Sequence, residues 1–171
     1  TVNLELVDMS ENPLSTPVTA SVTFTVNLAG PTYTSISDIQ NGIVTGDVWV
    51  KAIVSANFNG SDHGEGYYLQ QGGGAWNGIY VYDMVNSPAV GDSVEIAASI
   101  DDFFDMTQLE DVTSYSVFAI DGIVAAPTEV STLDAGTEQY ESVLVKVTNA
   151  VCDTVQNQYG EWWVNDGTGA L

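Results

Sequence analysis

Residues 47–82 decide the fold of this chain, and they read DVWVKAIVSANFN (47–59), GYYLQQGGG (66–74) and GIYVY (78–82) around two turns. Alternate positions of the first run place four apolar side chains on one face: Val48, Val50, Ala52 and Val54. The other face also carries apolar residues, Trp49 and Ile53, as expected of a long strand that takes part in two sheet layers. Alternation with a period of two is typical of β-strands. Glycines between the runs favour turns. The stretch therefore predicts three strands joined by glycine-rich turns.

Similar runs follow along the chain. Residues 93–100 and 114–120 each predict a strand, and Val94, Ile96 and Ala98 are expected to face inward in the first of these. The segment 36–42 fits either one helical turn or a bent strand. Five strands with no convincing amphipathic helix indicate an all-β barrel or sandwich.

The N-terminal residues 1–30 predict a β-hairpin, because Val2, Leu4 and Leu6 alternate with other residues and residues 20–28 alternate again. A two-stranded hairpin is marginally stable alone in water, so this one is expected to pack on another surface. It resembles the last hairpin of a Calx-β or immunoglobulin-like repeat of large bacterial surface proteins.

Several motifs resemble, in their order, the OB-fold modules of secreted bacterial extracellular nucleases. They are ISDIQ (36–40), VKAIVSANF (50–58), GYYLQ (66–70), GIYVY (78–82), VGD (90–92) and FFDMTQL (103–109). The resemblance implies an OB-like barrel over about residues 35–125. In that family the module precedes an endonuclease/exonuclease/phosphatase-type catalytic domain, and the residues of this chain do not include one.

The C-terminal part repeats the opening stretch. Residues 143–147 correspond to residues 48–52, and Lys146 corresponds to Lys51 at a shift of 146 − 51 = 95 residues. The same shift places Trp162 on Tyr67 without a gap. Repetition at a fixed shift indicates repeated structural units. We therefore predict three parts: a hairpin (1–30), an OB-like barrel (31–124) and an incomplete second OB-like copy (125–171).

The charge balance limits the partners. The chain has 23 acidic residues and two basic ones, Lys51 and Lys146, so its net charge is −21. Binding to nucleic acid depends on Lys and Arg that displace counterions. Tight binding of nucleic acid by this chain alone is therefore not expected. An acidic surface favours solubility in a salty or extracellular medium, and the expected location is extracellular or at the cell surface. No apolar run approaches the roughly 20 residues of a membrane helix.

Catalytic chemistry has little support in the sequence. The single histidine, His63, lies in a glycine-rich turn and is predicted to be exposed. The single cysteine, Cys152, follows an apolar run and is predicted to be a small buried side chain. One cysteine excludes an internal disulfide. We predict that this chain is not an enzyme and leave the activity of any longer parent protein open.

Two groups of residues are candidate sites. The aromatic residues on adjacent runs could stack on sugars or bases, or pack in a β core: Tyr67, Tyr68, Trp76, Tyr80 and Tyr82. The second group offers carboxylates to Ca²⁺ or forms a solvated acidic loop: Asp101, Asp102, Asp105, Glu110 and Asp111. Because Ile79 and Val81 suit the core, Tyr80 and Tyr82 are expected to point outward.

Three functions remain open at this point. The leading one is a non-catalytic structural or binding module of a secreted or surface-attached bacterial protein. The second is an accessory OB domain of a secreted nuclease. The third is a filament or surface-layer subunit assembled by β-strand exchange, because an unpaired strand edge can accept a strand from another chain. The expected partners are other domains of the same protein or neighbouring copies.

Overall fold

The computed structural model describes residues 30–60, 64–120, 122–152, 161 and 163–171. Residues 31–171 form one compact unit. The hairpin predicted for residues 1–30 and the turn at His63 lie outside the described residues, so both stay predictions.

The chain is all-β, as predicted, with two short α-helices and one 3₁₀ helix among the described residues. In chain order the elements are α1 (Ile36–Gln40), β1 (Asp47–Asn57), β2 (Tyr67–Gln70), β3 (Gly78–Val81), β4 (Ser93–Phe103), β5 (Met106–Ala119), β6 (Thr128–Glu129), α2 (Thr132–Ala135), the 3₁₀ helix η1 (Glu138–Tyr140), β7 (Val145–Lys146), β8 (Val151–Cys152) and β9 (Val164–Asn165). Within the part of the chain that is described, no helix has the length and apolar character needed to cross a membrane.

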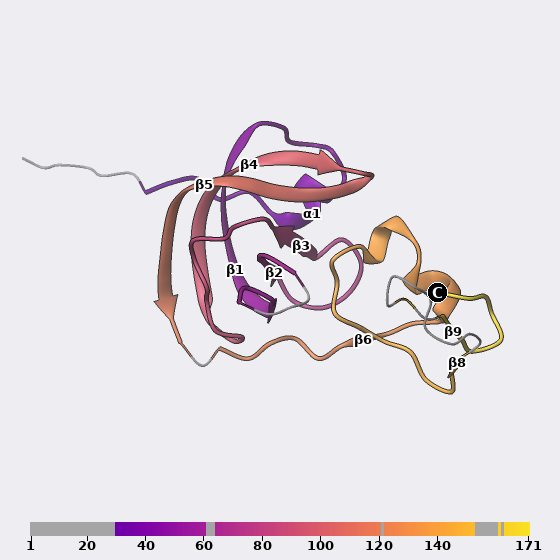
Figure 1. The fold of residues 1–171 in the computed structure, drawn as a ribbon. Helices are drawn as coiled ribbons and strands as arrows, with labels where there is room; N and C mark the ends of the chain where they lie inside the picture. Colours follow the sequence, from indigo (N-terminus) through magenta and orange to yellow (C-terminus); the bar gives the residue numbers. More distant parts are fainter. Residues whose placement is uncertain (1–29, 61–63, 121, 153–160, 162) are drawn as a thin grey trace, which may run out of the picture. The chain divides into compact units, whose positions relative to one another are not determined.

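Five strands close into a barrel in the order β1-β2-β3-β5-β4, and β4 pairs again with β1. The pairs are antiparallel except for β3 with β5, which run parallel at Tyr80–Gln108 and Val81–Leu109. Figure 1 shows β4 and β5 side by side. At 14 residues, β5 is the longest strand of the barrel. A closed five-stranded barrel of mixed pairing confirms the OB-like architecture that the motif order implied.

The barrel interior contains the alternate residues that the sequence predicted. Each of the four inward positions of β1 (Val48, Val50, Ala52 and Val54) is buried, as are Val94, Ile96 and Ala98 of β4. They form one cluster with side chains from the other strands and α1: Ile36, Ile39, Tyr67, Leu69, Ile79, Val81 and Leu109. Burial of these apolar side chains is the main force that closes the barrel.

The segment for which the sequence left two alternatives is helix α1. Ser35 caps it, because its hydroxyl oxygen accepts a hydrogen bond from the Asp38 amide at 3.1 Å. Ile36 and Ile39 then point into the core. The side chain of Gln40 is also buried, and its amide donates to the carbonyl of Gly78 at 2.7 Å. One helical turn therefore covers part of the core and is tied to β3.

The acidic segment 101–111 is a β-hairpin and not a loop. Strand β4 runs through Asp101 and Asp102 to Phe103, and β5 begins at Met106, opposite Phe103. Phe104 and Asp105 form the two-residue turn with φ of 55° and 64°, the left-handed values that a tight hairpin turn requires. The acidic composition of the segment masked this hairpin in the sequence, because its carboxylates lie in the turn and at exposed or partly exposed strand positions.

The C-terminal part lies against the barrel through backbone and side-chain hydrogen bonds. The side-chain oxygen Oε1 of the buried Gln70 in β2 accepts a hydrogen bond from the backbone N–H of Leu144 at 2.9 Å. The Gly74 amide donates to the Thr128 hydroxyl at 2.8 Å. Gly78 has no room for a side chain, because a Cβ there would stand 2.1 Å from the carbonyl oxygen of Ser142. The boundary placed between residues 124 and 125 is not tested by these contacts and stays a prediction.

The internal repeat has structural counterparts in these elements. At the 95-residue shift, β8 falls on the end of β1 and β9 on the end of β2, and both pairs are antiparallel. Their registers differ, because Val151 pairs with Asn165 whereas its counterpart Ala56 pairs with Tyr68. Helix α2 also begins as α1 does, because Ser131 accepts from the Asp134 amide as Ser35 accepts from that of Asp38. These two serines are 131 − 35 = 96 residues apart, so the likeness begins before the repeat that the sequence shows.

The prediction for Cys152 was wrong. Its side chain is exposed at the end of β8, next to Val151, which is also exposed. The apolar run that suggested burial belongs to a two-residue strand pair at the surface, and a pair that short buries little on either face.

Candidate functional site

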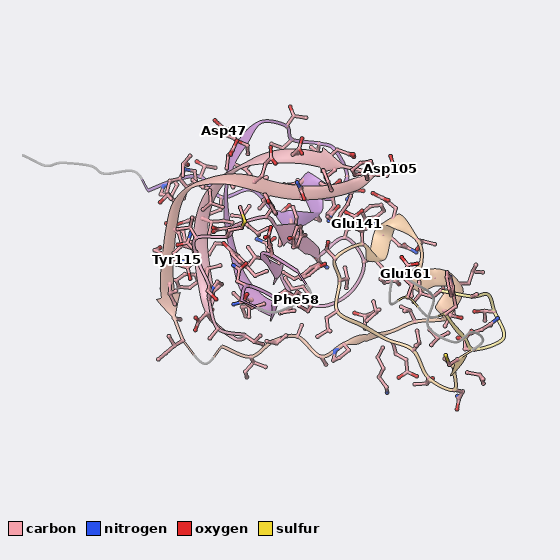
Figure 2. The ribbon with its side chains drawn as sticks, viewed as in Figure 1. Asp47, Phe58, Asp105, Tyr115, Glu141 and Glu161 are labelled. Atoms are coloured by element: carbon pink, nitrogen blue, oxygen red, sulfur yellow. The ribbon has the colours of Figure 1, made fainter. Side chains whose placement is uncertain are left out.

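A cleft of about 860 Å³ opens on the outer face of β2, β3 and β5. Two further parts border it: the β1–β2 loop, where Figure 2 labels Phe58, and the β4–β5 hairpin, where it labels Asp105 at the tip. The cleft is lined by Phe58, Gly64, Glu65, Tyr68, Tyr80, Tyr82, Phe103, Met106, Gln108 and Glu110. Strands 2 and 3 of OB folds, with the β1–β2 and β4–β5 loops, form the face that commonly binds ligands.

Aromatic rings form most of the cleft wall. The ring centroids of Tyr68 and Tyr80 are 5.1 Å apart with the planes tilted by 50°. Phe58 meets Tyr68 edge to face at 5.9 Å. Since Ile79 and Val81 are fully buried, the alternation in β3 turns Tyr80 outward, as predicted. The three rings support one another and form a preformed apolar wall.

The tyrosine hydroxyls fix Glu65 at the edge of the cleft. The Tyr80 hydroxyl donates to the backbone carbonyl of Glu65 in a short hydrogen bond. The Tyr82 hydroxyl donates to the Glu65 carboxylate at 3.3 Å. Burial raises the pKa of Tyr80, and the neighbouring Tyr68, Tyr82 and Glu65 raise it further. The Tyr80 hydroxyl is thus a protonated donor at neutral pH, and the hydrogen atoms of the Tyr80 and Tyr82 hydroxyls are both directed at Glu65.

Glu110 supplies a second carboxylate to the lining, from β5. Desolvation raises its pKa, and the negative charges of Asp101 and Asp111 raise it further. Among the described residues that line the cleft there is no Lys, Arg or His. The cleft is therefore aromatic and negatively charged.

The β4–β5 turn presents two exposed phenylalanines beside the cleft. Phe104 is 88% exposed and Phe103 is 54% exposed, and their rings meet edge to face at 4.7 Å. The positive φ of Phe104 is the value that the two-residue turn requires. Of the two rings, only that of Phe103 lines the cleft, so the turn adds one apolar side chain to the cleft wall.

A buried hydrogen-bond network beneath the cleft holds its loops. Asp83 is 6% exposed and accepts from the Tyr67 hydroxyl at 3.2 Å and from the Val85 and Asn86 amides. The Asn59 side chain donates to the backbone carbonyls of Asp83 and Asn86 and accepts from the Gly66 amide. Burial, followed by the nearby Asp83 carboxylate, strongly raises the pKa of Tyr67. The network fixes the loop that carries Glu65.

The structure separates the five aromatic residues predicted to bind a ligand. It brings Tyr68, Tyr80 and Tyr82 together in the cleft. Tyr67 points the other way, into the core, where its ring is fully buried. Trp76 lies in the β2–β3 turn, where its backbone amide donates to the carbonyl of Gln139 at 2.7 Å, and it does not line the cleft.

Sequence reasoning missed most of the cleft. Six of its ten lining residues lie outside the predicted sets: Phe58, Gly64, Glu65, Phe103, Met106 and Gln108. The one signal that pointed to them is the pair of phenylalanines in a polar segment, because apolar residues that cannot be buried are candidates for contact with a ligand.

The five acidic residues predicted to bind calcium lie along the β4–β5 hairpin: Asp101, Asp102, Asp105, Glu110 and Asp111. The Asp102 carboxylate accepts from the Asp105 amide at 3.1 Å and so caps the turn. In the described ranges, no three His, Cys, Asp or Glu side chains lie close enough together to hold a metal ion. Only Glu110 lines the cleft.

Calcium binding stays a prediction of the sequence. Since Ca²⁺ needs six to eight oxygen ligands, binding would have to draw the hairpin carboxylates together. It predicts a heat signal in calorimetry at millimolar Ca²⁺ and a higher melting temperature than in chelator. A flat titration with the same melting temperature in both buffers would show that the prediction is wrong.

Compared with known proteins, the chain matches no family model, no curated protein and no solved structure.

Proposed function

We propose that this chain is a non-catalytic binding module that holds a small organic ligand in the aromatic cleft of its OB-like barrel. The cleft itself is the observation that supports this most strongly. Three packed rings from two neighbouring strands (Tyr68, Tyr80) and a loop (Phe58) form a wall, and Phe103 at the end of β4 adds a further exposed ring to the lining. Concave, mostly apolar surfaces with a few polar groups are the usual form of ligand sites.

The chemistry of the lining favours binding over catalysis. General acid–base or nucleophilic catalysis needs a reactive group that is free to meet the substrate. The carboxylate of Glu65 accepts the Tyr82 hydroxyl, and the Tyr80 hydroxyl donates to the Glu65 backbone. These groups hold the loop in place, and the rings and the Glu110 carboxylate remain as the contact surface.

The setting of the module is part of the proposal. A net charge of −21 suits a secreted or surface-attached protein in a salty medium. The same charge and the carboxylates of the cleft oppose direct contact with phosphates. As an accessory domain of a nuclease, the module would therefore position its partner domain and not the nucleic acid. Assembly by strand exchange would use residues 1–30, which lie outside the described residues.

The proposal predicts where small molecules bind. In an NMR screen of aromatic and sugar fragments at millimolar concentration, we expect the amide shifts to cluster around Tyr68, Tyr80 and Gln108. The Tyr82→Ala variant is expected to bind these fragments at least about fivefold less tightly, because stacking on one aromatic ring is worth roughly 1–3 kcal/mol. Tyr33→Ala is the matched control, since Tyr33 and Tyr82 are both 40% exposed and Tyr33 does not line the cleft.

Unchanged fragment binding in Tyr82→Ala, or equal losses in both variants, would contradict the proposal. A screen in which no fragment shifts the cleft amides would also contradict it, if both variants melt at the temperature of the parent chain and are therefore folded.

A further inference from the structure

We infer that the cleft selects organic cations that carry a methylated ammonium group. The inference rests on the proposed function, because it assigns a ligand class to the same cleft. Three features of the cleft indicate this class. They are the aromatic wall, the carboxylates and the absence of a cationic side chain among the described lining residues.

Among the described residues, no cation lines the cleft to balance its negative charge. Glu65 and Glu110 both line it. The two lysines of the chain are used elsewhere. Lys51 Nζ lies 3.7 Å from the centroid of the Phe118 ring, and Lys146 Nζ lies 3.3 Å from a carboxylate oxygen of Glu129. A bound cation would therefore supply a charge that the protein does not, in a partly desolvated place where the attraction is stronger than in bulk water.

The aromatic wall favours a cation with weak hydration. Aromatic rings attract cations through the negative face of the π-system, and cages of several rings recognise quaternary ammonium groups. The cleft offers Phe58, Tyr68 and Tyr80 as one packed group, with Tyr82 and Phe103 beside them. Since the Tyr80 and Tyr82 hydroxyls donate to Glu65, their rings become richer in electrons and attract a cation more strongly.

The polar groups disfavour the main competing class, neutral sugars. A sugar needs donors and acceptors that match its hydroxyls. The hydrogen atoms of the Tyr80 and Tyr82 hydroxyls are used within the protein. Met106 and Phe103 add apolar side chains to the lining, and the remaining polar side chains are those of Gln108 and the two carboxylates, Glu65 and Glu110. A trimethylammonium group needs no directed hydrogen bond and fits such a wall.

The test compares two molecules of nearly the same shape. Choline and 3,3-dimethylbutan-1-ol differ in that a carbon atom replaces the charged nitrogen. In NMR titrations of the full chain we expect choline to bind at least about tenfold more tightly than the neutral alcohol. Raising the salt concentration is expected to weaken the binding of choline and to leave the binding of the alcohol unchanged. Phosphocholine is expected to bind less tightly than choline, because the carboxylates of the cleft repel its negatively charged phosphate.

Variants localise the effect. The Glu110→Gln variant is expected to bind choline about fivefold to tenfold less tightly, because the substitution removes one negative charge close to the bound cation. Glu95→Gln is the matched control, since Glu95 lies on β4 outside the cleft and its loss changes the net charge by the same amount. It is expected to bind choline as the parent chain does.

The outcomes separate the inference from the proposed function. Equal binding of choline and the alcohol, or equal losses in the two variants, would overturn the cation assignment and leave a ligand cleft without charge preference. Absence of choline binding also overturns it, whereas fragment binding in the screen above would still support the binding module. Tighter binding of phosphocholine than of choline would show that the anionic group is recognised, and it too would overturn the inference.

Discussion

Gly66→Ala is expected to destabilise the barrel by about 3 kcal/mol or more in urea unfolding at neutral pH. Gly66 has φ of 89°, a value that residues with a Cβ rarely adopt. A Cβ there would stand 2.2 Å from the Val81 carbonyl oxygen and 2.8 Å from the Tyr80 hydroxyl. Strand β3 would have to move, because the first of these atoms is backbone and cannot rotate away.

Gly72→Ala separates the clash from the backbone strain. Gly72 has φ of 87°, close to that of Gly66, but a Cβ there would meet no atom within 4 Å. Its expected cost is only about 1 kcal/mol, the usual penalty of a left-handed residue with a side chain. If the two variants had similar free energies of unfolding, the result would contradict the close contact between Gly66 and β3.

Asp83→Ala is the second change with a large expected effect, a loss of about 3 kcal/mol in the free energy of unfolding. The substitution leaves the buried Tyr67 hydroxyl and the Val85 and Asn86 amides without their acceptor. Buried donors without partners cost much more than the net value of the hydrogen bonds themselves. Because Asn59 joins this network to Gly66, ligand binding in the cleft is expected to weaken as well.

Two variants calibrate this effect. Asp47→Ala removes an exposed carboxylate that accepts one side-chain hydrogen bond, from the Ser99 hydroxyl at 2.7 Å, and is expected to cost less than about 1 kcal/mol. Tyr67→Phe removes a single bond of the network and is expected to cost about 1 kcal/mol. If Asp83→Ala costs no more than Asp47→Ala in the same urea titration, the network does not hold the loops.

Much of the fold could be predicted from the sequence, because strand alternation is a local pattern. Positions Val48 to Val54 and Val94 to Ala98 alternate as single strands do, and the structure buries the predicted faces. The order of motifs implied the barrel. The hairpin at Phe103–Met106 was missed because acidic side chains mask a strand whose apolar partners lie on other strands.

The candidate site was predicted only in part for a similar reason. Tyr80 and Tyr82 follow from the alternation of β3, which faces Ile79 and Val81 inward. Tyr67 and Tyr68 are neighbours in sequence, so one had to point inward and the other outward, and alternation alone does not say which turns toward the ligand. Phe58 reaches the cleft from a loop, and loops have no periodicity to interpret.

The sequence by itself determined the all-β class, the core faces of β1 and β4, the acidic character and the repeated unit, because alternation, composition and repetition are carried by residues close along the chain. Only the tertiary structure decided that the aromatic residues divide between a core and a cleft. It also decided that Glu65 and Glu110 share that cleft with Phe58 and Phe103. The physical reason is barrel closure, which brings together strands and loops that the sequence keeps far apart.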